Sequence, residues 1–248
     1  MKKLLNILVI ISIVFVVAFG VIIFILFKKS QKVDTSLLEM NTAVNRDGVD
    51  GKKGRADDTP SINLIFYKQN GEKELKDVVI EVLDGTNNQL TYVTVPLDTE
   101  IGMSQELYED LSTVYTDIPQ YSRLRQFGQI FKKDKEYRYA QLILDDILGI
   151  DSSYYTVITG EQASFQEYQK QMQVQAQGRG ENELSALIKN AYEHISSNLS
   201  KKKKASQASL YANIPSNAIT FTEIEGTRHT NSFEIDATNF QVFMSQFQ

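Results

Sequence analysis

Short apolar segments rich in β-branched residues lie in the first half of the chain and are typical of β-strands, and residues 89–95 also alternate between apolar and polar positions. Residues 62–67 form the first such segment, and residues 77–83 and 89–95 form the next two. Residues 84–88 separate the second from the third and consist of turn-forming Asp, Gly, Thr and Asn. The pattern predicts an opening strand, a turn near residue 70, and then a β-hairpin.

Apolar residues recur at spacings of three and four along later segments, as they do on one face of a helix. Residues 139–148 form the first of these segments, and Gly149 ends it. Residues 181–200 show the clearest helical pattern and predict a helix that faces the core. Residues 105–115 and the terminal residues 239–247 are predicted as further helices.

More strands are expected in the second half of the chain. Residues 154–158 predict a short strand, and residues 218–224 and 232–236 predict a strand pair around a turn near Gly226. The order is therefore strands, helix, strand, helix and strands. This order predicts an α/β fold with a central mixed β-sheet covered by helices.

The N-terminus carries an almost unbroken apolar run over residues 4–27, with lysines on both sides. About 20 apolar residues are enough to cross a bilayer, and no small-residue cleavage site follows the run. We expect an uncleaved signal anchor within residues 1–32, although the flanking lysines do not orient it. Residues 33–60 have little apolar content and predict a flexible linker. Residues 61–248 are then long enough for one folded domain.

Composition excludes several classes of partner and site. The chain has 26 basic and 31 acidic residues, and its first 32 residues hold five of the lysines and no acid, so the remainder has a net charge of −10. Such a domain is repelled by nucleic acid, and no nucleic-acid partner is expected. The absence of cysteine excludes disulfides and cysteine-based zinc sites.

Two blocks of sequence resemble the LytR-CpsA-Psr family of membrane-anchored cell-wall proteins. In the first, Asp77 opens one strand and residues 95–99, Val-Pro-Leu-Asp-Thr, close the next, where the family has Ile-Pro-Arg-Asp-Thr or a close variant. In the second, residues 148–155 match a helix end, a Leu-Gly-Ile turn and a strand with two tyrosines. The resemblance places the domain outside the cell membrane, anchored through the N-terminal helix. It implies, as partner, a glycopolymer linked to a polyprenyl pyrophosphate, or another cell-wall component.

The resemblance also implies roles for five residues. Asp77 and Asp98 would hold a divalent cation such as Mg²⁺, which prefers carboxylate and phosphate oxygens. Arg123 matches a basic catalytic and substrate-binding position, and Arg125 and Arg179 are further candidates for binding substrate. The purely structural alternatives are a strand start, a turn cap, two surface arginines and a Gly-Arg-Gly turn.

Several positions depart from the family pattern. Leu97 stands where the family has an arginine that binds pyrophosphate, and the glutamine-rich residues 166–177 contain no Arg-x-Arg pair. We therefore expect a non-catalytic or weakly active relative of the phosphotransferases that attach glycopolymers to peptidoglycan. The alternatives are an active Mg²⁺-dependent phosphotransferase, and an anchored interaction or structural protein with only fold-level resemblance.

Overall fold

The computed structural model describes residues 55, 60–176, 195–200 and 218–247. The expected signal anchor and almost all of the expected linker lie outside these residues. Within the described residues, no helix is both long and apolar enough to cross a membrane. Arg55, inside the expected linker, is held on the domain because its amide donates to the Ser153 carbonyl (2.8 Å) and its guanidinium pairs with Asp151 (2.8 Å).

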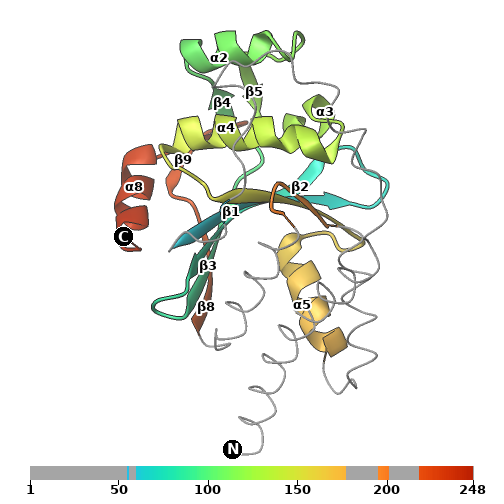
Figure 1. Ribbon diagram of the computed structural model, residues 1–248, viewed down its shortest axis with the longest axis vertical. Coiled ribbons are helices and arrows are strands. Elements are labelled where there is room, and N and C mark those ends of the chain that lie inside the picture. Colours follow the sequence, from blue (N-terminus) through green and yellow to red (C-terminus); the bar gives the residue numbers. More distant parts are fainter. Residues whose placement is uncertain (1–54, 56–59, 177–194, 201–217, 248) are drawn as a thin grey trace, which may run out of the picture.

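A mixed β-sheet forms the centre of the described domain (Figure 1). The strand order is β7-β6-β1-β2-β3-β8; β1 is parallel to β6, β3 is parallel to β8, and the other neighbours are antiparallel. The predicted mixed sheet and the predicted hairpin are therefore confirmed. The strands are β1 (Ser61–Gln69), β2 (Leu75–Asp84), β3 (Gln89–Val95), β6 (Tyr154–Gly160), β7 (Ile195–Ser197) and β8 (Ile219–Glu223).

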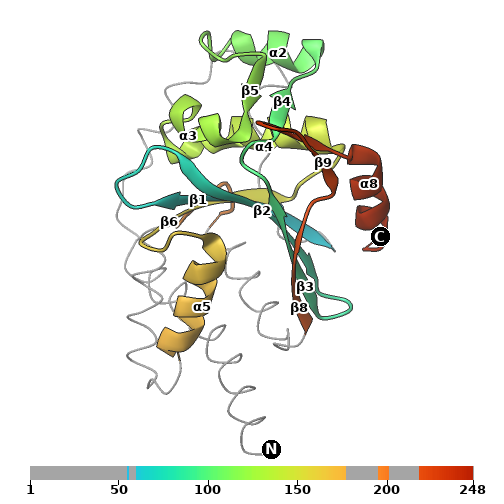
Figure 2. The same cartoon turned by 180° about the vertical axis from the view of Figure 1, so that it is seen from behind.

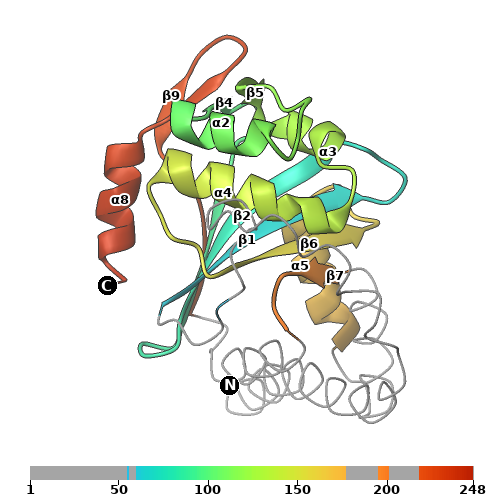
Figure 3. The ribbon, with the colours of Figure 1, turned by 45° about the horizontal axis from the view of Figure 1, so that its top comes forward.

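Helices cover both faces of this sheet, with α4 and α2 on one side and α5 on the other (Figures 1 and 2). Figure 3 shows α4 lying across the sheet and α8 beside it. The helices are α2 (Gln105–Ser112), α3 (Phe127–Ile130), α4 (Tyr137–Leu148), α5 (Phe165–Ala176) and α8 (Ala237–Ser245), with 3₁₀ turns η2 (Leu124–Gln126) and η3 (Asp134–Glu136). Small antiparallel pairs are β4 (Glu100–Gly102) with β5 (Tyr121–Arg123), and β9 (Gly226–Arg228) with β10 (Phe233–Ile235).

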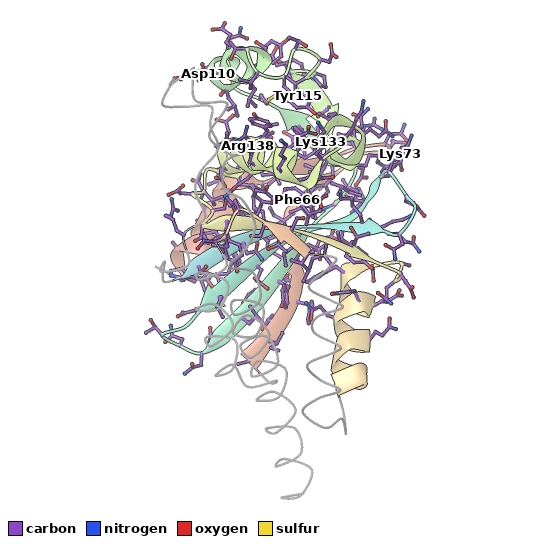
Figure 4. The ribbon with its side chains drawn as sticks, turned by 45° about the vertical axis from the view of Figure 1, so that its right-hand side comes forward. Phe66, Lys73, Asp110, Tyr115, Lys133 and Arg138 are labelled. Carbon is purple, nitrogen blue, oxygen red and sulfur yellow. The ribbon has the colours of Figure 1, made fainter. Side chains whose placement is uncertain are left out.

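The sheet is buried on both faces because successive side chains of a strand point to opposite sides. In β1, Leu64 and Phe66 join the main apolar core under α4, whereas Ile65 and Tyr67 join a second cluster with Phe165 of α5. Figure 4 places Phe66 between the sheet and α4, where its ring lies 4.8 Å from that of Tyr137. The apolar residues of β1 therefore pack alternately into two apolar clusters, one on each face of the sheet.

Asp84 fixes the turn of the β2–β3 hairpin. One carboxylate oxygen accepts the amide protons of Thr86 (2.9 Å) and Asn87 (3.0 Å), and the other accepts the Asn87 side-chain amide (2.7 Å). Burial raises the pKa of Asp84, but the hydrogen bonds from Asn87 and Thr86 outweigh it and hold the pKa below its usual 3.8. The turn-forming residues seen in the sequence thus act through one carboxylate.

We expect Asp84→Ala to destabilise the domain by about 1–2 kcal/mol at neutral pH, because three hydrogen bonds are lost. A pKa that is lower in the folded state stabilises the protein fully above the unfolded value of 3.8, and this contribution disappears as the pH falls through the folded pKa. Melting curves followed by circular dichroism from pH 2 to 7 should therefore converge in acid. Asp117→Ala, at an exposed position, is the control; a constant difference across all pH values would contradict the prediction.

Two predictions are wrong within the described residues. Residues 181–194 of the predicted helix over 181–200 lie outside the described residues. The last part of this segment is instead a strand at Ile195–Ser197, and residues 198–200 are not helical. Ile195 pairs with Ile158, so the backbone groups at the edge of β6 are satisfied by pairing, which outweighs local periodicity. The predicted pairing of residues 218–224 with 232–236 is also wrong.

The closing strands instead find other partners. β8 runs parallel to β3, and β10 pairs with β9, so that Phe233 lies opposite Arg228. At Gly226 a Cβ atom would lie 2.2 Å from the Glu234 carbonyl oxygen. The residue expected to form a turn therefore begins a strand, at a place where two backbones approach so closely that only glycine fits.

Candidate functional site

The turn after β3, from Pro96 to Thr99, is fixed by hydrogen bonds. The amide of Thr99 (3.0 Å) and its hydroxyl (2.6 Å) both donate to the Pro96 carbonyl, and Thr99 is completely buried. The carbonyl of Asp98 accepts the Phe233 amide proton (3.0 Å), which ties the turn to β10. Asp98 therefore has a rigid backbone position at one end of the sheet.

The segment with two of the predicted arginines lies against the same turn. The amide of Leu124 donates to the Thr99 carbonyl (3.0 Å), and the amide of Arg125 donates to the Leu97 carbonyl (2.9 Å). Arg123, which precedes them, pairs across β4–β5 with Glu100. The side chains of Arg123 and Arg125 are exposed, and their backbone lies against the turn that carries Asp98.

Asp98 itself pairs with Arg228 of β9, an arginine that the sequence analysis did not identify. Nη1 of Arg228 lies 3.2 Å from Oδ2 of Asp98, whose side chain is 21% exposed. Nη2 lies 3.5 Å from Glu223, and the guanidinium carbon lies 5.4 Å from the centre of the Phe233 ring. The position of Arg228 just after Gly226 is the only local signal, and it does not indicate a partner 130 residues earlier.

The carboxylate of Asp77 lies on the α5 side of the sheet, where it accepts a hydrogen bond. Its Oδ2 accepts the amide proton of Phe165 (2.6 Å), the first residue of α5. Burial raises the pKa of Asp77 above its usual 3.8, the hydrogen bond from Phe165 lowers it, and the charge of Glu167 raises it again. The chemistry of Asp77 in this structure is therefore that of a cap for the N-terminus of a helix.

The register brings Asp77 and Asp98 to the same end of the sheet, because Val78 pairs with Val95. The two carboxylates nevertheless have separate partners, Phe165 and Arg228. Among the described residues, no group of three or more His, Asp or Glu side chains could hold a metal ion. In this arrangement the residues do not fit a shared Mg²⁺ site, which needs several oxygens in near-octahedral geometry. Arg179, the last predicted site residue, lies outside the described residues.

Leu97 stands at the position where the family resemblance places an arginine. Its half-buried side chain packs against the main apolar core under α4. The turn therefore directs an apolar group into the protein at this position, and the carbonyl of Leu97 is used to bind the Arg125 amide.

A depression of about 540 Å³ lies beside the Asp98–Arg228 pair, between β8, the β9–β10 pair and the start of α8. Arg228 is the one basic residue among those that line it, and three acidic residues line it as well. It is lined by Glu223, Ile224, Glu225, Gly226, Thr227, Arg228, Phe233, Asp236 and Asn239.

Comparison with known proteins gives matches among solved structures alone. No family model matches the sequence, and no curated protein matches it. The protein gbs0355 from Streptococcus agalactiae has 10% sequence identity and a TM-score of 0.54, over 76% of this chain and 86% of that one. The described domain therefore has the fold of this streptococcal protein.

Two further solved structures are similar to the chain. TagT bound to LIIa-WTA has 8% identity and a TM-score of 0.48, over 79% of this chain and 92% of that one. TagV of B. subtilis has 13% identity and a TM-score of 0.46, over 79% of this chain and 97% of that one.

Proposed function

We propose that the chain is a membrane-anchored envelope protein of LytR-CpsA-Psr type whose outward-facing domain binds a polyprenyl-linked cell-wall glycopolymer without transferring it. The two sequence blocks support this proposal, because residues 77–99 form the β2–β3 hairpin with its closing turn, and residues 148–155 join α4 to β6. The apolar run over residues 4–27 would anchor the protein.

The observation that carries the proposal is the side-chain chemistry of the turn after β3. Leu97 packs into the apolar core in place of a guanidinium, and Asp98 is already neutralised by Arg228. A hydrogen bond to a charged group contributes about 1.5–3 kcal/mol, so a head-group site without the family's arginines holds pyrophosphate weakly. Stabilisation of charge in a transition state is reduced for the same reason.

A second candidate function is that of a working phosphotransferase, and one observation favours it. Arg123 and Arg125 are exposed beside Asp98 and could contact a phosphate there. In that case Arg123 would act on the transferred phosphate and Arg125 would bind the substrate.

The full-length protein in detergent, titrated with a polyprenyl pyrophosphate and with the corresponding polyprenyl alcohol, should bind both lipids. We expect the pyrophosphate to bind about a hundredfold more tightly, the value of two charge-assisted hydrogen bonds worth about tenfold each. Arg125→Gln should reduce this difference about tenfold. Phosphate release in the presence of Mg²⁺ should equal that of the lipid without protein.

The exposed Lys170 on α5 provides the matched control, because Lys170→Gln removes one positive charge far along the sequence from the turn. It should leave both affinities unchanged. Phosphate release above the blank that disappears in Arg123→Gln would establish the transferase instead. Failure to bind either lipid would reject both lipid-dependent functions.

A further inference from the structure

The guanidinium of Arg228 lies at a position where a cation bridges two carboxylates. Its two terminal nitrogens lie 3.2 Å from Asp98 and 3.5 Å from Glu223, which belong to a turn and a strand far apart in sequence. The ring of Phe233, the cross-strand partner of Arg228, supports the guanidinium at 5.4 Å. Three contacts from three elements thus hold one positive charge in place.

A metal ion at Asp98 would need a second carboxylate, but the side chain of Asp77 lies on the other face of the sheet. Asp77 shares its face of β2 with Val79, which packs in the α5 cluster, and it accepts the Phe165 amide at 2.6 Å. Leu97 and Phe233, beside Asp98 and Arg228, pack in the other core. A divalent cation at Asp98 would meet the charge of Arg228 rather than a second aspartate.

We infer that Arg228 replaces a divalent cation at this site, so that the domain binds its phosphate-bearing ligand without metal. The guanidinium has five N–H groups, of which Asp98 and Glu223 engage two, and its side chain is 56% exposed. Its remaining donors are available to a phosphate oxygen. The inference rests on the proposed function only in taking a phosphate-bearing lipid as the ligand.

Binding of Mn²⁺ to the full-length protein in detergent, followed by electron paramagnetic resonance without lipid, tests the replacement directly. The wild type should have no Mn²⁺ site that depends on Asp98, so the wild type and Asp98→Asn should give the same Mn²⁺ signal. Arg228→Ala leaves Asp98 and Glu223 unneutralised around one vacated position, and it should bind Mn²⁺ at least about tenfold more tightly than the wild type. The double variant Arg228→Ala/Asp98→Asn should lose this gain.

The lipid measurement then tests the consequence for the ligand. Affinity of the wild type for polyprenyl pyrophosphate should be the same in EDTA and in Mg²⁺, and Arg228→Ala should lower it about tenfold in EDTA. Circular dichroism melts should show that the variants fold, because an exposed ion pair contributes only about 0–1 kcal/mol.

Stoichiometric Mn²⁺ binding by the wild type that Asp98→Asn removes overturns the inference, as does an Arg228→Ala variant that gains no Mn²⁺ affinity. If the variants bind Mn²⁺ as expected but the wild type binds neither lipid, the proposed function is wrong. The inference that Arg228 replaces a cation is then still supported. If the wild type binds polyprenyl pyrophosphate in Mg²⁺ but not in EDTA, the inference that the domain binds its ligand without metal is wrong.

Discussion

Glu81→Ala should lower the melting temperature of the domain by about 10 °C, the largest effect that we expect from a single substitution. Glu81 is 4% exposed in the middle of the sheet, where it accepts the side-chain amide of Asn63 at 2.9 Å and the Tyr92 hydroxyl. Asn63 in turn accepts the hydroxyl of Thr156 at 3.1 Å. Removal of the Glu81 carboxylate leaves the Asn63 amide and the Tyr92 hydroxyl buried without their acceptor, which costs about 1–3 kcal/mol for each group. A domain of this size loses about 2–4 °C per kcal/mol.

Glu81→Gln is the matched control, because its amide oxygen can still accept the Asn63 proton and its volume is unchanged. We expect it to cost about 1 kcal/mol. Circular dichroism melts of the two variants and the wild type at pH 7 make the comparison. Equal losses for Ala and Gln would mean that the negative charge itself, rather than the hydrogen bonds and the filled volume, stabilises the sheet.

Gly128→Ala should cost about 3 kcal/mol, or about 5–10 °C in melting temperature. A Cβ atom at Gly128 would lie 2.2 Å from the carbonyl oxygen of Lys73 and 3.0 Å from the amide of Leu75. Both are backbone atoms beside the turn between β1 and β2, where Figure 4 shows Lys73. The clash must therefore push α3 away, together with the preceding segment that carries Arg125.

Gly102→Ala provides the matched control. The added Cβ atom would lie 3.2 Å from the ring of Tyr121, whose side chain is 74% exposed and can turn away. Its effect on the melting temperature should stay within about 2 °C. A Gly128→Ala variant as stable as the wild type would contradict the close packing of α3 on the β1–β2 turn.

Short apolar segments rich in β-branched residues predicted β1, β2 and β3, because each strand of the hairpin follows the last through a short turn. The helix predicted over residues 139–148 is α4, which begins two residues earlier and ends at Gly149 in the left-handed conformation (φ 62°). The glutamine-rich segment after residue 165 gave no amphipathic signal, yet it forms α5. Glutamine is a good helix former, and Ser164 accepts the Glu167 amide proton at 3.2 Å, so propensity and a cap suffice there.

The sequence by itself determined the α/β class, the hairpin and the position of Asp98 at its end, since local periodicity and turn chemistry act between neighbouring residues. Only the tertiary structure decided which groups these carboxylates meet. Asp98 meets Arg228 from 130 residues away, and Asp77 meets the start of α5 from 88 residues away. Such pairings depend on strand order and register, as the parallel contact of β8 with β3 shows, and no local pattern encodes them.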